Sequence, residues 1–389
     1  MVVNFEFLGE EAIENLITCM NFKIDKLVYF GYQDTIDVQR DITENFLKKY
    51  CDVKNVMFVA LPHNNMQEII KIMRSEIQKE IDNKNQIYFD ITGGESLILV
   101  AFGMLSMDYE TPMHMYDIEN DKLIELDANA KTNISQNVEK RKVAMTLDLL
   151  VKMHGGKINT NLKKDIKGIN DQDFMDDIEL IYQTAKKNWS YWNPFSDFLR
   201  STMVPVNSSD FSVRKKTSTI IKALSASKSS LKSIKQLNKI VDELALKGIL
   251  LDVKHSGENY SFRFKNKEIK ECLWEGGSIL ELHTCLKESK INNECQVGVH
   301  LDWDGIIHGI PGQDVLNEID VLSLNGNIPT FISCKSGKMG SQQALHALYE
   351  LETVTRRFGG KYAKKVLVTA KGLGNVYMER AKEMGIEVR

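Results

Sequence analysis

The N-terminal third of the chain alternates short apolar segments with longer segments of helical periodicity. Near-continuous apolar strands that alternate with helices indicate a parallel sheet covered on both faces. The pattern therefore predicts a Rossmann-like, doubly wound α/β domain. The expected strands are Val2–Leu8, Lys26–Tyr32, Asn55–Leu61, Asn85–Ile91 and Pro112–Ile118; the expected helices are Glu10–Met20, Ile36–Lys49, Met66–Ile81 and one that runs from the Gly93-Gly94 turn through Met107.

Three polar or glycine-rich loops, at residues 8–11, 31–35 and 90–96, leave the carboxyl ends of these strands, where doubly wound sheets bind ligands. In the last loop, Thr92-Gly93-Gly94 lets the backbone approach a ligand closely and aims the N–H groups of the next helix at it, which favours phosphate. A tight turn with a helix cap is the alternative interpretation. The sequence has neither GxGxxG nor GxxxxGK[ST], which argues against a dinucleotide cofactor and a P-loop nucleotide.

The centre of the chain, about residues 139–272, has a helical pattern and a local block of positive charge. Segment 211–241 contains no acidic residue; an amphipathic helix ending at Gly248 and a hairpin turning at 255–259 follow it. A helix followed by a β-wing is typical of a winged helix, and the positive block indicates phosphate-backbone contact, with a solvated lysine face as the alternative. The aromatic residues of 186–200 are expected to pack between domains. The basic block consists of Arg214, Lys215, Lys216, Lys222, Lys228, Lys232, Lys235 and Lys239.

The last part of the chain predicts a smaller α/β unit. Its order is helix, three strands, helix, strand, which is the order of a small α/β nuclease core, and a closing helix runs through Met384. The expected elements are the helix Gly277–Glu288, the strands Cys295–Trp303, 317–322 and Thr330–Lys335, the helix Ser341–Phe358 and the strand Lys365–Thr369.

Charged residues gather on the two central strands of this unit. Successive side chains of a strand leave opposite faces, so Glu318 and Asp320 share one face and Ser333 and Lys335 share one face of the next strand. Carboxylates hold magnesium or manganese, which polarises a phosphoryl oxygen and activates water, and a nearby lysine stabilises the transition-state charge. Glu281 approaches from the preceding helix. The pattern predicts a metal-dependent nuclease site.

Ser333 stands where such a site usually carries a third acid. We expect another carboxylate to complete the metal shell, with Glu281, Glu318 and Glu350 as candidates and Glu281 and Glu318 preferred. Ser333 can still bond a metal-bound water. A charged edge hairpin is the alternative, but it leaves Lys335 unexplained beside apolar Ile332 and Cys334.

The composition, with 43% hydrophobic and 26% charged residues, is that of an ordinary globular protein. With 389 residues the chain is expected to form three domains, at residues 1–135, 136–270 and 271–389. The net charge of −3 makes any nucleic-acid surface a local one. Six scattered cysteines without a CxxC pair fit a reducing cytoplasm, and the chain shows no signal peptide and no apolar run long enough for a membrane span.

Two motifs together carry a resemblance to a known family. DITGGES at Asp90–Ser96 and NEIDVL…FISCKSG at Asn317–Gly337, with QALHALYELETVTRRFGGKYAKKVLV after them, resemble the ancillary nucleases of type III CRISPR systems, which join a CARF sensor to a PD-(D/E)xK nuclease. The resemblance implies a homodimer that binds a cyclic oligoadenylate, most often cyclic tetra-adenylate. It also implies a manganese- or magnesium-dependent nuclease that cuts single-stranded RNA and DNA, or nicks DNA.

The resemblance also assigns residues. Asp320 and Lys335 would fill the Asp and Lys positions of the nuclease motif, and Ser333 departs from its acid. The sensor pocket would be lined by Gly9, Gly31, Tyr32, Gln33, Thr92, Gly93, Gly94 and Glu95.

Two other functions are compatible with the sequence. The chain could be a ligand-regulated transcription factor that works through the winged-helix-like segment, with an inert nuclease fold. It could also be a ring nuclease, in which the sensor itself, about residues 1–126, cleaves the cyclic oligoadenylate.

Overall fold

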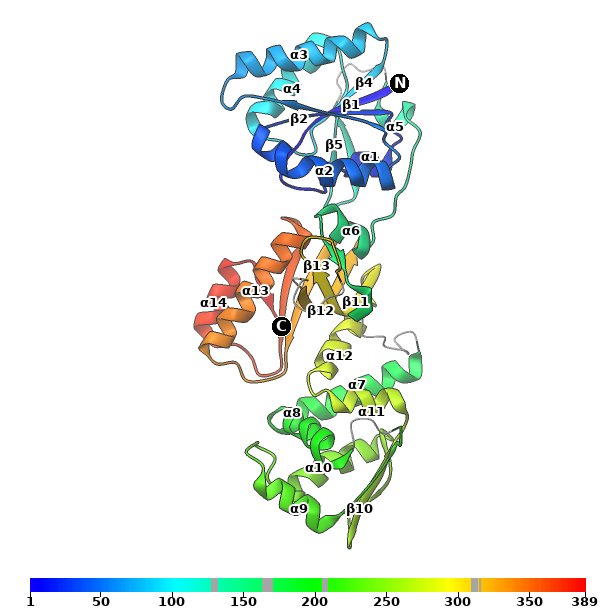
Figure 1. Ribbon diagram of the computed structural model, residues 1–389, viewed down its shortest axis with the longest axis vertical. Helices are drawn as coiled ribbons and strands as arrows, with labels where there is room; N and C mark the ends of the chain where they lie inside the picture. The colour runs from blue at the N-terminus through cyan, green and yellow to red at the C-terminus, as the bar shows by residue number, and fades with distance from the viewer. Residues whose placement is uncertain (127–131, 163–170, 205–208, 309–313, 315) are drawn as a thin grey trace.

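The computed structural model describes residues 1–126, 132–162, 171–204, 209–308, 314 and 316–389. Three units stack along the long axis (Figure 1). The N-terminal unit (residues 2–126) lies at one end, the C-terminal unit (147–158 and 278–388) in the middle, and the central unit (172–274) at the other end. The order of the units in space therefore differs from their order in the sequence.

The N-terminal unit is the predicted doubly wound α/β fold. Its six-stranded sheet has the order β3-β2-β1-β4-β5-β6, parallel except for β6, which pairs antiparallel with β5 and was not predicted. One apolar cluster under α3 and α4 and another under α1 and α2 cover the two faces. The strands are β1 Val2–Phe7, β2 Lys26–Gly31, β3 Asn55–Ala60, β4 Gln86–Asp90, β5 Met113–Asp117 and β6 Lys122–Leu126; the helices are α1 Ile17–Asn21, α2 Gln33–Tyr50, α3 Met66–Asp82 and α4 Ser96–Tyr109.

The expected helix Glu10–Met20 is wrong over its first half, because α1 begins only at Ile17. Asn15 ties the preceding turns to the end of β1: its side-chain oxygen accepts from the Gly9 N–H at 3.0 Å, and its amide donates to the Gly9 carbonyl at 2.9 Å. Side-chain bonds of this kind compete with helical hydrogen bonds. The loop is thereby kept open at the ligand edge of the sheet.

The central unit has the predicted winged-helix topology. A three-stranded antiparallel sheet, β8-β10-β9, contains the predicted hairpin and one strand that was not predicted, β8. A capping box between Ser233 and Gln236 sets the start of α10. The elements are α7 Gln172–Lys187, α8 Trp189–Phe198, a π-helical turn Leu199–Met203, β8 Ser212–Lys216, α9 Thr217–Ala226, α10 Ile234–Leu246, β9 Leu250–Lys254, β10 Asn259–Phe264 and α11 Lys267–Trp274.

The aromatic stretch 186–200 packs between units, as predicted. Trp192 and Phe195 are fully buried in one apolar cluster that also contains Ile279 and Leu282 of α12. The central and C-terminal units therefore share a core.

The C-terminal unit has the predicted nuclease-like order of elements around a six-stranded sheet, β15-β14-β13-β12-β11-β7. α12 covers one face of it, and α13 with α6 covers the other. α6 and β7 come from the expected connecting region 136–270, and β7 hydrogen-bonds to β11. The elements are α6 Leu147–Met153, β7 Lys157–Ile158, α12 Ser278–Glu288, β11 Glu294–Asp302, β12 Leu316–Asn325, β13 Ile328–Lys335, α13 Ser341–Gly359, β14 Lys364–Thr369, α14 Asn375–Glu383 and β15 Ile386–Val388.

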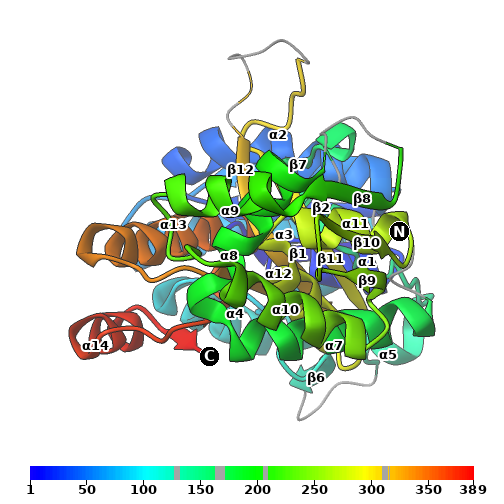
Figure 2. The same ribbon diagram turned by 90° about the horizontal axis from the view of Figure 1, so that it is seen from below.

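Seen from the end that carries the central unit, α13 and α14 project to one side of the stack (Figure 2). The short helix α5 Ile134–Asn137 follows the N-terminal unit, and the 3-10 turn Thr160–Leu162 follows β7. The predicted strands and long helices of all three units are otherwise confirmed to within a few residues.

Candidate nuclease and ligand sites

The nuclease candidates of β12 and β13 lie side by side. Asp320 Oδ2 accepts hydrogen bonds from Ser333 Oγ at 3.1 Å and from the Cys334 N–H at 2.5 Å. Lys335 Nζ lies 3.8 Å from the same oxygen. Ser333 is buried and Lys335 is half-buried, so the serine anchors the carboxylate from below while the ammonium group remains accessible. The sequence placed these three residues together, and the structure does the same.

Glu281 reaches this site from α12. Its carboxylate lies next to Gly277 and near Ser336, the residue after Lys335. Asp320, Glu281 and Lys335 all lie close enough to the Cys334 thiol to affect its pKa. Burial raises this pKa, the charges of Asp320 and Glu281 raise it further, and Lys335 lowers it. The first turn of α12 therefore presents a second acid to the end of β13.

The two other glutamates differ in position. Glu318 is exposed and lies two residues before Asp320 on the same strand. Glu350 lies on α13, where its carboxylate is 3.9 Å from His346 on the next turn. Glu350 thus pairs within its own helix.

The site offers only a few carboxylates, so it fits a hard divalent cation that takes most of its ligands from water and substrate. Among the described residues, no three His, Cys, Asp or Glu side chains gather closely enough to hold a metal ion. Magnesium, however, is often bound by one or two carboxylates together with waters and substrate phosphates. Asp320 and Glu281, beside a lysine, match that donor set.

Sequence reasoning missed one contact at this site. The Asn193 amide of α8 donates to Ser336 Oγ at 3.0 Å across 143 residues of sequence. The Asn193 backbone also packs against Gly276, where a side chain would meet it at 3.0 Å. The central unit is therefore attached directly beside Lys335. No local signal in the sequence marks Asn193.

At the other end of the molecule, the predicted ligand loops meet at the switch point between β1 and β4. Tyr32 Oη donates to Glu95 at 2.8 Å, and its ring stacks on His63 with 3.9 Å between centroids. Burial, together with the Glu95 hydrogen bond, raises the pKa of Tyr32 to about 12. Gly94 has φ of +140°, a conformation that favours glycine.

Thr92 has a structural role in this loop. Its hydroxyl accepts from the Tyr116 N–H at 2.9 Å, and its own N–H donates to Asp90 at 2.8 Å. Burial by itself would raise the pKa of Asp90, but the charge and hydrogen bond of His114, with bonds from Thr18 and Thr92, lower it to about 2. A buried, ionised Asp90 thus holds the loop in place.

A cavity of about 820 Å³ separates the ligand edge from the C-terminal unit. Of the predicted pocket residues, Gly9, Tyr32, Gly94 and Glu95 line it. Gly31, Gln33, Thr92 and Gly93 do not; the Gln33 amide, for example, donates to Asp37 on its own helix. The opposite wall was missed by sequence reasoning, because it comes from the far end of the chain: Glu352, Thr355, Arg356, Gly360, Lys361, Ala363, Lys365 and Gly385.

An acidic pair joins the two walls. Glu14 accepts from Lys361 Nζ and from Tyr362 Oη, both at 2.6 Å, and Glu11 accepts from the Lys361 N–H at 2.8 Å. Burial raises the pKa of Glu11, which the Lys361 bond partly offsets. A side chain at Gly93 would meet Glu14 at 2.8 Å. This clamp (Glu11, Glu14, Lys361 and Tyr362) therefore touches the Thr92-Gly93-Gly94 loop.

Within the part of the chain that the structure describes, no helix has both the length and the apolar character needed to cross a bilayer. A search of curated protein sequences finds no match. Residues 273–389 match the family described as Card1-like, endonuclease domain.

Two solved structures share the fold of the whole chain. Protein VC1899 from Vibrio cholerae is 15% identical with a TM-score of 0.69, and Can2 from Sulfobacillus thermosulfidooxidans, solved in complex with cyclic tetra-adenylate, is 13% identical with a TM-score of 0.63. Each alignment covers 100% of this chain and 93% of the other. The chain thus has a C-terminal part that matches a Card1-like endonuclease domain, and over its whole length it has the fold of VC1899 and Can2.

Proposed function

We propose that this protein is a cytoplasmic, homodimeric, manganese- or magnesium-dependent endonuclease that a cyclic oligoadenylate activates. In this proposal residues 1–135 are the sensor, 136–270 the connecting region and 271–389 the nuclease. The observation that carries it is the cluster of Asp320, Ser333 and Lys335 at the end of β12 and β13, inside the part that matches a Card1-like endonuclease domain.

Each residue of the cluster has a distinct role in phosphodiester hydrolysis. Asp320 and Glu281 would hold the divalent ion, which supplies polarisation of the phosphoryl oxygen and a water of lowered pKa. Lys335 orients the nucleophile or stabilises the charge that develops on the phosphoryl group. Ser333 fixes the Asp320 carboxylate through its 3.1 Å hydrogen bond, and Glu318 is a second candidate ligand on the strand face of Asp320.

The sensor role rests on the loops at the switch point and on the fold. Gly94 and the start of α4 offer backbone N–H groups to a phosphate. Can2, which shares the fold, was solved with cyclic tetra-adenylate, so we propose a ligand of this class here. On the opposite wall of the cavity, Lys361 and Lys365 are paired with Glu14 and Glu352, and Arg356 is the further basic group of this lining that could meet a phosphate.

A two-fold symmetric ligand implies a symmetric dimer. α4, which follows the glycine loop, exposes Val100, Met104 and Met107 at 54%, 50% and 77% on one face. Apolar stripes of this kind mark interaction surfaces. We assign this stripe to contact with a second copy of the chain.

The test is a cleavage assay with a panel of cyclic oligoadenylates and labelled single-stranded RNA, single-stranded DNA and duplex DNA, with manganese or with EDTA. We expect Asp320→Ala and Lys335→Ala to abolish metal-dependent cleavage while calorimetry shows unchanged ligand binding, because the two sites lie in different units. Lys382→Ala, on the exposed side of α14, is the control and should cleave normally. Undiminished cleavage by both site variants would refute the nuclease assignment.

The winged-helix topology of the central unit also fits a second function, that of a ligand-regulated transcription factor. The same assay separates the two, since a regulator would bind DNA without metal-dependent cleavage at any ligand concentration. A ring nuclease would instead consume the cyclic oligoadenylate in the absence of any other substrate, and the loss would persist in Lys335→Ala.

A further inference from the structure

The central unit carries a block of exposed basic side chains that form no ion pair with a carboxylate of the described residues. Segment 211–241 forms β8, α9 and the first part of α10, and seven of its eight basic side chains are exposed; Lys215 is half-buried. Among the described residues, none of the eight forms an ion pair with a carboxylate, whereas many lysines elsewhere do, for example Lys26, Lys247 and Lys265.

The nearest acids of the same helix already have other partners. Asp242 lies 2.7 Å from His255 Nε2 of the wing. Glu243 lies 2.9 Å from Lys187 and 3.6 Å from Lys247. The positive charge of the block is therefore not balanced by carboxylates of the described residues.

The block has a regular geometry on α10. Lys232 precedes the helix, and Lys235 and Lys239 are exposed at a spacing of four, opposite the buried Leu237, Ile240 and Val241. Residues three and four apart share one face of a helix. α10 therefore turns a basic stripe outward.

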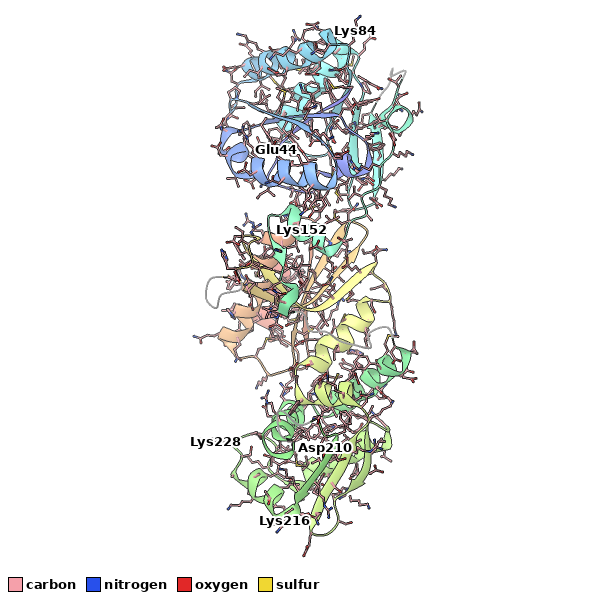
Figure 3. The ribbon with its side chains drawn as sticks, turned by 45° about the vertical axis from the view of Figure 1, so that its right-hand side comes forward. Glu44, Lys84, Lys152, Asp210, Lys216 and Lys228 are labelled. Carbon is pink, nitrogen blue, oxygen red and sulfur yellow. The ribbon has the colours of Figure 1, made fainter. Side chains whose placement is uncertain are left out.

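The preceding elements extend this stripe. Lys216 lies at the N-cap of α9, whose first turn adds the exposed hydroxyls of Ser218 and Thr219. Figure 3 shows Lys216 and Lys228 at the outer edge of the central unit, and Lys84 at the opposite end of the molecule. The basic face is remote from the candidate ligand pocket.

We infer that the outward face of α9 and α10 docks duplex DNA by its phosphate backbone. In a helix-turn-helix the second helix lies in the major groove while the first crosses the backbone, and α9 and α10 occupy these positions in the unit's topology. A helix about 10–12 Å across fits the roughly 12 Å wide major groove of B-form DNA. The block consists almost wholly of lysines, which contact phosphates without reading sequence, so binding is independent of base sequence.

Other nucleic acids fit this face less well. The major groove of A-form RNA is too narrow and deep for side chains to read. Single strands are bound through stacking on aromatic side chains, and Phe211, 36% exposed, is the one aromatic residue of segment 211–241. Duplex DNA remains the partner whose shape and charge match the surface.

The location of the central unit links DNA binding to the nuclease. Through Asn193 of α8 and Ser336 the central unit is attached next to Lys335, so DNA held on α9 and α10 is tethered to the unit that carries the catalytic end of β13. This consequence names the substrate class of the nuclease and rests on the proposed function. The docking itself does not depend on it.

The test measures fluorescence anisotropy of a labelled duplex DNA of unrelated sequence, with the full-length Lys335→Ala chain in EDTA so that no cleavage interferes. Each phosphate contact adds roughly 0.9 to the slope of log affinity against log salt concentration. We expect Lys235→Ala/Lys239→Ala to reduce this slope by about 1.8 and to weaken binding equally for different sequences. Alanine keeps α10 helical, and circular dichroism checks the fold.

The matched control is Lys54→Ala/Lys71→Ala, which removes two exposed lysines of the N-terminal unit and the same net charge. It should bind like the parent. The inference is overturned if both pairs lose affinity equally, if neither does, or if a single-stranded RNA of equal length binds more tightly with the same sensitivity to Lys235 and Lys239.

A separate measurement distinguishes failure of the DNA-docking inference from failure of the nuclease assignment. With activator and manganese, Lys235→Ala/Lys239→Ala in the otherwise native chain should lose cleavage of duplex DNA more than cleavage of a short single strand. Equal loss on both substrates would contradict the docking inference, while the Asp320 and Lys335 variants continue to test the nuclease.

Discussion

At the scale of single residues, the nuclease candidate has Ser333 at the position of a usual third acid, and there the serine holds the Asp320 carboxylate. A serine hydroxyl donates one hydrogen bond to the carboxylate and keeps its negative charge available to a metal ion. In the proposed site Glu281, from a helix rather than from the strand, supplies the second carboxylate. The proposed ligands then come from two elements.

This division leads to a prediction about relative effects. Ser333→Ala should lower cleavage by about 10- to 100-fold, which is typical for loss of a group that positions a metal ligand. Glu281→Gln should lower it by considerably more, or raise the manganese concentration required, because a carboxylate is lost from the ion itself. Glu350→Gln, a carboxylate paired with His346, is the control and should change little.

Steady-state kinetics over a manganese titration measure both effects. If Ser333→Ala is as inactive as Lys335→Ala while Glu281→Gln cleaves normally, the serine contacts the ion or the substrate directly and the assignment is reversed.

At the scale of elements, the start of α4 depends on one glycine. Gly94 has φ of +140°, and a side chain there would approach the Leu99 side chain to 2.9 Å. Backbone conformations of this kind cost other residues about 1–3 kcal/mol and persist where the surroundings enforce them, often at ligand sites. The N–H groups of α4 are thus presented at the cavity by a turn that only glycine forms easily.

Gly94→Val should therefore raise the concentration of cyclic oligoadenylate needed for half-maximal activation, while ligand-independent cleavage stays intact. Gly257→Val, at a glycine of φ +105° in the wing with open space around it and away from the cavity, is the matched control for backbone strain. A dose–response curve of cleavage gives the comparison. Unchanged activation in Gly94→Val would reduce Thr92-Gly93-Gly94 to an ordinary turn.

α13 connects the two candidate sites within one element. It begins six residues after Lys335 and ends at Gly359, one residue before the turn that contacts Glu11. Nineteen helical residues span about 28 Å at 1.5 Å per residue. A rigid helix of this length carries a displacement at one end to the other.

At the scale of the whole molecule, the C-terminal unit lies between the ligand edge and the DNA-docking face (Figure 1). The clamp of Glu11, Glu14, Lys361 and Tyr362 is a direct contact between the ligand loop and the C-terminal unit, through which a signal from the loop can pass. Allosteric coupling requires differential contacts of this type between sites.

Lys361→Ala should lower the ratio of cleavage with saturating activator to cleavage without it by roughly 5- to 150-fold, the usual range for a coupling of this kind. By reciprocity the affinity for the activator should change as well. Lys23→Ala removes a comparable ion pair, with Glu139 at 2.9 Å, that lies away from the cavity, and should leave the ratio unchanged. An unaltered ratio in Lys361→Ala would show that the signal takes another route.

The sequence by itself determined the elements and the chemistry that lies within them. Burial of one face imposes a period of two residues on a strand and of 3.6 residues on a helix, and this period is visible in the local sequence. Examples are the alternation of Ile319 and Val321 with Asp320 and the apolar runs of the N-terminal strands. The facing positions of Asp320, Ser333 and Lys335 follow from that period and a short turn. For the same reason the winged helix and the glycine loop after β4 were predictable.

Only the tertiary structure decided what lies between the units. The Asn193–Ser336 bond, the clamp between Glu14 and Lys361, and the pairing of β7 with β11 join segments far apart in sequence. Such contacts depend on surfaces that exist only after each unit has folded, so no local period marks the residues that make them. Thr92 shows the converse: its sequence context indicated a ligand, but packing directs its hydroxyl to the Tyr116 N–H.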